Sequence, residues 1–398
     1  MSVRLNMTPD DLLDMARQST GLNSFGDERF LASFRKIVES VNANTSFTED
    51  GRELAIARFQ RVLINRLRFQ ADWDAHPEIH EQEIVAPVFI LGMPRTGSTK
   101  LHRLLYQGGD FTGMMMWQGY NFAPFPDADR EAEDPRIDEA ARFLHWRASR
   151  HSGISKAHHA EACQPEEEIY LLEPAFSSWA PNGYFEMPDY IEWIREQDRD
   201  HVYALLRRLL KYLQWQHHRG EAPKRWILKA PPHLGRETDI LKNFPDAQFI
   251  MLHRDIMSVV PSLISLTFAM RHQYTANESN KRDIADWVMD EFTDAYRRHM
   301  SWRKNTHADV LDLAYSKIVS DDMGCVEDIY RFLGMEVSNA AKEAMRAWSD
   351  ANQVHQQGVH AYDLEGTGLS ESAIRQRFAF YVDAFSNFLP NNKQDARS

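Results

Sequence analysis

Apolar residues in the first 80 positions recur at intervals of three and four. The recurring positions are Leu12, Leu13, Met15, Phe30, Leu31, Phe34, Ile37, Leu54, Ile56, Phe59, Val62, Leu63 and Leu67. This spacing places side chains on one face of an α-helix, so the pattern predicts several amphipathic helices. Polar stretches at residues 23–27 and 44–48 separate them, and Glu49 and Asp50 are typical of a helix start. We therefore predict a helical N-terminal subdomain over residues 1–82.

Short apolar runs of the kind that form β-strands appear later in the chain. They span residues 88–91, 226–228, 248–252 and 310–313, and each is followed by a turn and a helical pattern. Alternation of strands and helices predicts an α/β fold, a three-layer sandwich with a central parallel sheet. The aromatic-rich stretch over about residues 107–224 is interpreted as a largely helical insertion that forms a cap or binds an acceptor substrate. We assign residues 83–390 to this domain and residues 391–398 to a disordered tail.

The turn after the first strand carries the strongest chemical signal. Gly92 and Gly97 allow a tight backbone turn, and the amides that open the next helix are suited to bind an anion. In a nucleoside triphosphatase loop a lysine follows the second glycine, whereas Ser98 stands there in this chain. Arg95 keeps the loop cationic. The loop therefore indicates a phosphorylated ligand other than a triphosphate.

A second cationic position follows the third strand. Arg254 comes directly after the apolar run at residues 249–252, and Ser258 and Ser262 lie four positions apart on the following helix. Ligands of open α/β sheets bind at the carboxyl ends of the strands. An arginine and a hydroxyl group at that edge can hold a phosphate, although an arginine in a salt bridge would give the same local pattern.

Composition excludes several functional classes. The net charge of −12 leaves no general basic field, which argues against nucleic-acid binding. No apolar run approaches the roughly 20 residues of a membrane span, and the start resembles a helix cap rather than a signal peptide, so we expect a cytoplasmic protein without an integral membrane segment. Cys163 and Cys325 are too few for a disulfide framework, and the histidine pair at residues 158–159 lacks a helical partner, so we expect no metal.

These motifs and three others occur in the order found in one family. The others are an LK-x-P-x-HL segment at residues 228–234, an HxY-x-L segment at 360–364 and an FxxY pattern at 378–381. The chain resembles the sulfotransferases that use 3′-phosphoadenosine 5′-phosphosulfate (PAPS), especially the bacterial branch with a helical N-terminal extension. The resemblance covers nearly the whole chain and implies a P-loop-like fold. The chain departs mildly from the family pattern at Ser98, which replaces the usual threonine, and in the middle segment at residues 230–232.

The resemblance assigns a role to each motif. The implied 5′-phosphosulfate loop comprises Pro94, Arg95, Thr96, Gly97, Ser98 and Thr99. Arg254 and Ser262 would bind the 3′-phosphate, His360 would approach a phosphate, and Tyr362 would stack on adenine. Lys229 would stabilise charge on the leaving group together with Arg95. PAPS is then the co-substrate.

Transfer of a sulfuryl group from PAPS also needs a base that removes the proton of the acceptor hydroxyl. His233 follows Lys229 by four residues, and a neutral imidazole suits removal of a hydroxyl proton. A helix-capping role for His233 is the alternative. Glu167, Glu168 and His159 compete for the base role, although a run of acids is usually a solvated helix face.

The aromatic density of the insertion indicates a hydrophobic acceptor, although core packing explains the same residues. We predict an enzyme that transfers a sulfuryl group from PAPS to a hydroxyl, or less favourably an amine, of a small hydrophobic, phenolic, sterol or lipid acceptor. A P-loop-type ATP-dependent kinase and a non-catalytic nucleotide-binding module are the alternatives. The sequence leaves the choice between a monomer and a homodimer open.

Overall fold

A computed structural model describes residues 7–126, 128–129, 132–150, 159–217, 223–275, 281–352 and 364–390. The chain divides into two compact units. Unit 1 comprises residues 1–84, 114–223 and 267–279, and unit 2 comprises residues 85–113, 224–266 and 280–398. The predicted domain boundaries stay predictions, and the predicted tail at 391–398 lies outside the described residues.

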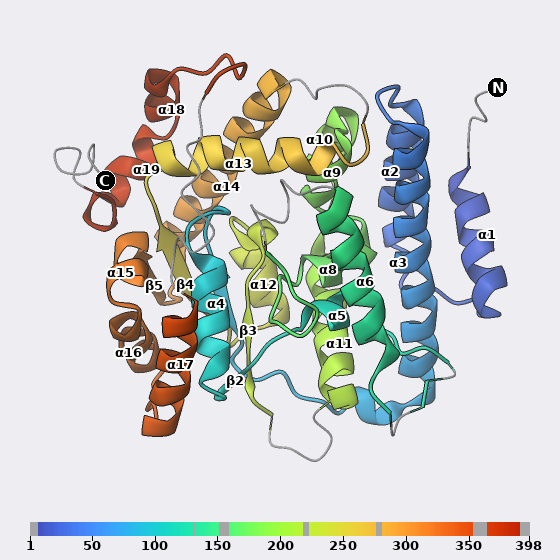
Figure 1. Ribbon diagram of the computed structural model, residues 1–398, viewed down its shortest axis with the longest axis horizontal. Coiled ribbons are helices and arrows are strands. Elements are labelled where there is room, and N and C mark those ends of the chain that lie inside the picture. Colours follow the sequence, from blue (N-terminus) through green and yellow to red (C-terminus); the bar gives the residue numbers. More distant parts are fainter. Residues whose placement is uncertain are drawn as a thin grey trace. The chain divides into compact units, whose positions relative to one another are not determined.

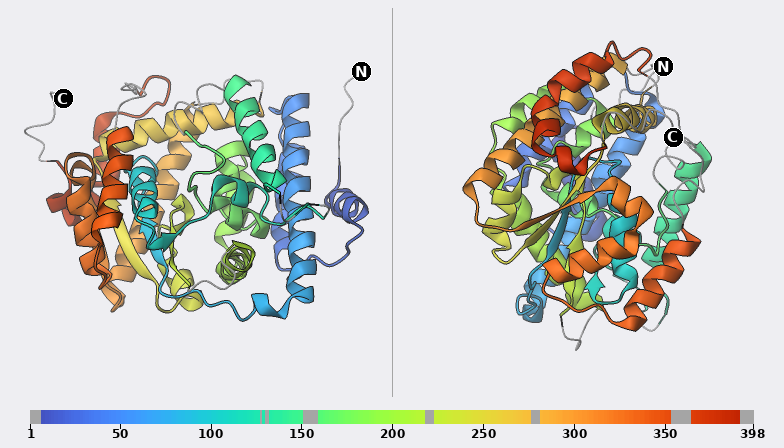
Figure 2. Two further views of the ribbon diagram at one scale, coloured as in Figure 1. Left: turned by 60° about the horizontal axis from the view of Figure 1, so that its bottom comes forward. Right: turned by 90° about the vertical axis from the view of Figure 1, so that its left-hand side faces the viewer.

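Unit 1 begins with the helices that the periodicity predicts. They are α1 (Pro9–Thr20), α2 (Phe30–Ala43) and α3 (Glu49–Ala75), the blue helices of Figure 2. The Thr8 hydroxyl accepts a bond from the Asp11 amide and caps α1, while Thr48 caps α3 in the same way. Most of the periodic apolar side chains are buried, but Met15 is exposed. The helical N-terminal pattern is confirmed.

The insertion contributes further helices to unit 1. They are α5 (Met116–Tyr120), α6 (Pro135–Arg150), α8 (Ile169–Leu172), α9 (Ala180–Phe185), α10 (Pro188–Arg195) and α11 (Asp200–His217), with short 3-10 turns η1 (Pro77–Ile79) and η2 (Glu173–Ala175). Phe176 packs on Phe34 of α2 with ring centroids 4.9 Å apart, and Phe185 packs on Phe59 of α3 at 5.8 Å. Both side chains belong to the core of unit 1, as the packing interpretation predicts.

An ion-pair cluster joins the insertion to α3. Glu173 pairs with both Arg58 and Arg61, and little of any of the three side chains is exposed. Burial alone would raise the pKa of Glu173, but the two arginines outweigh burial and hold that pKa below its ordinary value of 4.5. The ionised carboxylate therefore stabilises the folded state above pH 4.5, and this contribution is lost as the pH falls further.

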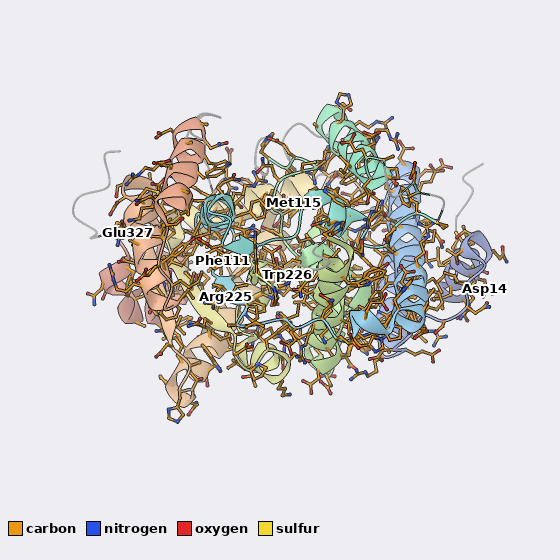
Figure 3. The ribbon with its side chains drawn as sticks, turned by 90° about the horizontal axis from the view of Figure 1, so that it is seen from below. Asp14, Phe111, Met115, Arg225, Trp226 and Glu327 are labelled. Atoms are coloured by element: carbon orange, nitrogen blue, oxygen red, sulfur yellow. The ribbon has the colours of Figure 1, made fainter. Side chains whose placement is uncertain are left out.

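Glu173→Gln is expected to lower the free energy of unfolding by about 3 kcal/mol at pH 7, because it leaves two largely buried arginines without a counter-charge. Thermal melting of both proteins at several pH values measures this loss, which should shrink below pH 4.5. Glu327→Gln is the control, since the exposed Glu327 of Figure 3 pairs with Lys342 at the surface and should not change the melting temperature. An equal loss at pH 3 and pH 7 would contradict the electrostatic explanation.

Unit 2 is built on a parallel sheet of five strands in the order β2-β3-β1-β4-β5. The strands are β1 (Val88–Leu91), β2 (Phe111–Thr112), β3 (Arg225–Leu228), β4 (Gln248–His253) and β5 (Val310–Ala314). Strands β1, β3, β4 and β5 are those predicted from the apolar runs. The edge strand β2 was not predicted, because two residues carry no periodic signal; its Phe111 pairs with Arg225 of β3 (Figure 3).

Helices cover both faces of this sheet. One face packs on α4 (Ser98–Gln107), α16 (Asp322–Phe332) and α17 (Asn339–Ala351), as shown in Figure 1. On the other face Phe89 of β1 contacts Phe244 after α12 (Glu237–Asn243), and Phe249 of β4 contacts Trp302 of α14 (Lys281–Asn305). The predicted three-layer α/β architecture is confirmed.

The remaining elements follow the ends of strands β3, β4 and β5 or come after the last strand in the chain. They are η3 (Pro231–His233), α13 (Ile256–Arg271), α15 (Tyr315–Ser320), α18 (Glu371–Arg377), α19 (Ala379–Ala384) and η4 (Ser386–Phe388). Among the described residues, no helix is both long enough and apolar enough to span a bilayer.

Candidate functional site

The loop after β1 adopts the tight turn that its glycines predict. Gly97 has a φ of 86°, and a Cβ atom there would lie 3.0 Å from the ring of Tyr315. The Thr96 hydroxyl is buried and donates a 2.7 Å bond to the Met93 carbonyl, which closes the turn. Arg95 also has a left-handed backbone, with a φ of 74°. A non-glycine residue in this region is strained and needs support from its surroundings.

That support comes from the second cationic segment. Arg254 donates from Nη1 to the Arg95 carbonyl at 2.6 Å, and Arg95 donates from Nε to the Ser262 hydroxyl at 3.1 Å. The Arg254 guanidinium also lies over the ring of Tyr315, 3.9 Å from its centroid. Three residues that the sequence analysis proposed for two separate phosphate sites are therefore in direct contact.

The helix that follows the loop adds backbone donors to this site. Helix α4 begins at Ser98 with Gly97 as its N-cap, so its first amides and the positive end of its dipole lie at the loop. The ammonium group of Lys100, in the first turn of α4, is engaged by other residues of the chain. Its Nζ lies 2.9 Å from Asp322 Oδ2 and donates to the Ile318 carbonyl at 3.4 Å.

Lys229 reaches the same helix start from the end of β3. Its side chain is 2% exposed, and its Nζ donates to the Thr99 hydroxyl at 3.2 Å. His233 lies in η3 with 0% exposure, and its ring meets that of Phe89 edge-on with centroids 5.0 Å apart. The candidate residues Pro94 and Ser98 are half-buried in the loop and at the start of α4. His360 and Tyr362 lie outside the described residues.

The competing bases have different environments in unit 1. His159 and Glu161 are both exposed and pair with each other at 2.8 Å. Glu166 and Glu168 are buried, at 2% and 1% exposure. The acidic run at residues 166–168 lies outside helical structure and ends where α8 begins. The expectation of a solvated helix face is therefore wrong for these two acids, because the sequence signal of a charge run does not report tertiary burial.

Several polar residues at the carboxyl edge of the sheet were not among the site residues predicted from the sequence. Tyr315 directly follows β5 and stacks on Arg254. His253 is the last residue of β4, and its Nε2 lies 2.8 Å from Oδ1 of Asp312 in β5. Arg303 donates from Nη1 to the same oxygen at 2.6 Å. Their position at strand ends was the available signal. Burial lowers the pKa of His253 despite the opposing bond to Asp312, so the imidazole is neutral at pH 7.

Metal coordination has no support in the described residues. Across these residues, no group of three or more histidine, cysteine, aspartate or glutamate side chains is arranged to hold a metal ion.

Comparison with known proteins places these features in a family context. The model of the Sulfotransferase family matches residues 87–339. Two curated relatives, from Mycobacterium bovis and Mycobacterium tuberculosis, are named omega-hydroxy-beta-dihydromenaquinone-9 sulfotransferase Stf3, and each is 27% identical over 259 residues. Each match covers 63% of this chain and 63% of the relative, so the chain spans less than two thirds of the length of these curated relatives.

Two solved structures resemble the whole chain. The sulfotransferase STF9 from Mycobacterium avium has a TM-score of 0.86 and 26% identity, and the match covers 97% of this chain and 98% of that one. The sulfotransferase STF1 from Mycobacterium tuberculosis has a TM-score of 0.81 and 26% identity, with 95% of this chain and 100% of that one covered.

Proposed function

Because this chain belongs to the sulfotransferase family, we propose that it transfers a sulfuryl group from PAPS to a hydroxyl group of a hydrophobic or lipid acceptor. The observation that carries the proposal is the contact between Arg254 and the Arg95 carbonyl. It joins two cationic segments at neighbouring strand ends, β1 and β4. PAPS carries phosphate on both the 5′ and the 3′ oxygen of its ribose, and this arrangement suits a ligand with two separate anionic groups.

The same site is poorly suited to a nucleoside triphosphate. A P-loop enzyme uses the lysine after its second glycine to contact the β- and γ-phosphates. Ser98 occupies that position, and the nearby Lys100 is engaged by Asp322. These observations favour PAPS over ATP and the transferase over the kinase alternative.

The donor supplies the sulfuryl group. The chain's own residues would bind the donor, orient it and neutralise its charge. The amides at the start of α4 and the Arg95 side chain would hold the 5′-phosphosulfate, while Arg254 and Ser262 would hold the 3′-phosphate. Lys229, next to Thr99, would stabilise the negative charge that develops on the leaving phosphate oxygen. The loop geometry that Gly92 and Gly97 allow brings the backbone close to such an anion.

The acceptor oxygen must lose its proton as its new bond to sulfur forms and the bond from sulfur to the bridging oxygen breaks. We propose His233 as the base that takes this proton. The buried carboxylate of Glu168 is the strongest competitor, because the exposed pair of His159 and Glu161 is open to bulk water. Glu167 lies beside it and is half-buried.

The acceptor class rests on the relatives. Both curated relatives are named for an omega-hydroxylated dihydromenaquinone, a lipid with a hydroxyl group. By analogy we propose a hydroxyl-bearing lipid rather than an amine for this chain. Screening lipid alcohols, phenols and sterols with sulfur-labelled PAPS identifies the acceptor, and label found only on amines would contradict the proposal.

The donor is tested by calorimetry with 3′,5′-adenosine bisphosphate and with ATP. We expect the bisphosphate to bind more tightly than ATP, with no dependence on Mg²⁺, because Arg95 and Arg254 offer a cation to each of its phosphates and position 98 holds no lysine. Adenosine 5′-phosphate measures the part of the affinity that does not involve the 3′-phosphate. Tighter, Mg²⁺-dependent binding of ATP would overturn the proposed function in favour of the kinase.

A further inference from the structure

A buried aromatic cluster surrounds the last residue of β4. His253 is 0% exposed, and its ring stacks on Phe385 and Phe388 with centroids 4.3 Å and 5.2 Å away. Both of its ring nitrogens have partners. Nδ1 lies 3.1 Å from the Tyr381 hydroxyl and Nε2 lies 2.8 Å from Asp312 Oδ1. The end of β4 is therefore held by the C-terminal helix α19 on one side and by β5 on the other.

The direction of these hydrogen bonds follows from the chemistry of the partners. The pKa of Asp312 is lowered, because the bonds from His253 and Arg303 outweigh its burial, so its carboxylate is ionised and can only accept. His253 Nε2 must then donate, and in a neutral imidazole Nδ1 must accept from the Tyr381 O–H. This leaves the Tyr381 oxygen as an acceptor, and both the Tyr296 hydroxyl and the backbone N–H of Arg254 face it.

A continuous path of contacts connects Tyr381 to the phosphosulfate loop. His253 is bonded covalently to Arg254, whose guanidinium holds the strained Arg95 carbonyl. Arg95 in turn contacts Ser262. A shift of the β4 end would therefore move the arginine proposed for the 3′-phosphate.

We propose that Tyr381 is a positioning residue for donor binding, which acts through His253 to set the place and direction of Arg254. This inference rests on the proposed function, because it uses the role of Arg254 as a 3′-phosphate ligand. Tyr381 does not contact the donor itself. Its hydroxyl satisfies the buried His253 Nδ1 and orients the peptide unit that begins Arg254.

A purely apolar core would not need this hydroxyl. Tyr381 is 0% exposed, and its ring packs on Tyr296 with centroids 4.3 Å apart, a contact that phenylalanine would keep. Tyr381→Phe therefore preserves the packing but removes the hydroxyl that donates to Nδ1 and that also faces the Tyr296 hydroxyl and the Arg254 backbone N–H. The unsatisfied nitrogen of a buried imidazole is costly, so the ring of His253 is expected to move.

Binding of two nucleotides separates positioning from stability. Tyr381→Phe is expected to weaken binding of 3′,5′-adenosine bisphosphate about tenfold while changing binding of adenosine 5′-phosphate less than twofold. In turnover assays the same variant should raise the donor KM and leave the acceptor KM unchanged. A residue that served only stability would lower the melting temperature without changing the ratio of the two affinities.

Tyr330→Phe is the matched control. Tyr330 is a buried tyrosine of the same unit whose hydroxyl donates to Asp110 at 2.8 Å, and it packs on the face of the sheet covered by α4, α16 and α17. We expect this variant to lose stability and to keep both nucleotide affinities. An equal change of the affinity ratio in Tyr330→Phe and Tyr381→Phe would overturn the inference.

Phe385→Leu provides a second route if Tyr381→Phe does not fold. It removes the closest ring stacked on His253 and should reduce the preference for the bisphosphate in the same direction. Unchanged preference in the folded variants would overturn this inference while the wild-type preference for the bisphosphate stands. A wild-type chain that binds the bisphosphate no better than adenosine 5′-phosphate would instead overturn the proposed role of Arg254.

Discussion

His233→Ala is expected to lower kcat by about 10²–10⁴ while leaving the affinity for 3′,5′-adenosine bisphosphate nearly unchanged. The variant removes the group proposed to accept the acceptor proton, but it leaves the contacts of Arg95, Arg254 and Lys229 in place. Single-turnover assays with labelled PAPS measure the chemical step directly. Calorimetry on the same preparation measures the donor site.

Chemical rescue distinguishes a base from a structural histidine. The His233 side chain is fully buried, so alanine leaves space for a small base, and added imidazole should restore part of kcat as its neutral fraction rises with pH. His233→Gln keeps much of the side-chain volume and should be equally slow. Normal turnover in both variants would show that the base lies elsewhere, and Glu168→Gln, Glu167→Gln and His159→Ala would then be compared.

Arg254→Ala is expected to have the complementary effect. It should weaken binding of the bisphosphate by about 10²-fold, because it removes a charge-assisted contact to the proposed 3′-phosphate, and the preference over adenosine 5′-phosphate should nearly disappear. Its effect on kcat at saturating donor should be much smaller. Calorimetry with the bisphosphate and with adenosine 5′-phosphate measures the two affinities. Measurement of KM and kcat for PAPS then shows whether the effect falls on donor binding rather than on turnover.

A distant arginine controls for the change of charge. Arg331 in α16 is exposed and pairs with Asp328, so Arg331→Ala removes the same charge from unit 2 and should leave nucleotide binding unchanged. If Arg254→Ala weakened the bisphosphate and adenosine 5′-phosphate equally, its effect would come from the loop through the Arg95 carbonyl rather than from the 3′-phosphate.

The fold was predictable to the extent that its signals are local. Strands β1, β3, β4 and β5 each contain a short apolar run that is followed by helical periodicity, so they could be recognised without a structure. Strand β2 is two residues long and exists because β3 offers it hydrogen-bonding partners. The burial of Glu166 and Glu168 likewise depends on what packs around them, and the charge run itself predicts the opposite.

The candidate site shows the same division. The sequence by itself determined the glycine turn, the helix start at Ser98 and the candidates Arg95, Lys229, His233 and Arg254, because each depends on a short motif and its position after a strand. Only the tertiary structure decided that Arg254 supports the carbonyl of Arg95, 159 positions away, and that Tyr381 anchors this strand end. Such contacts follow from the order and register of parallel strands and from burial of the Tyr381 side chain, which no local pattern encodes.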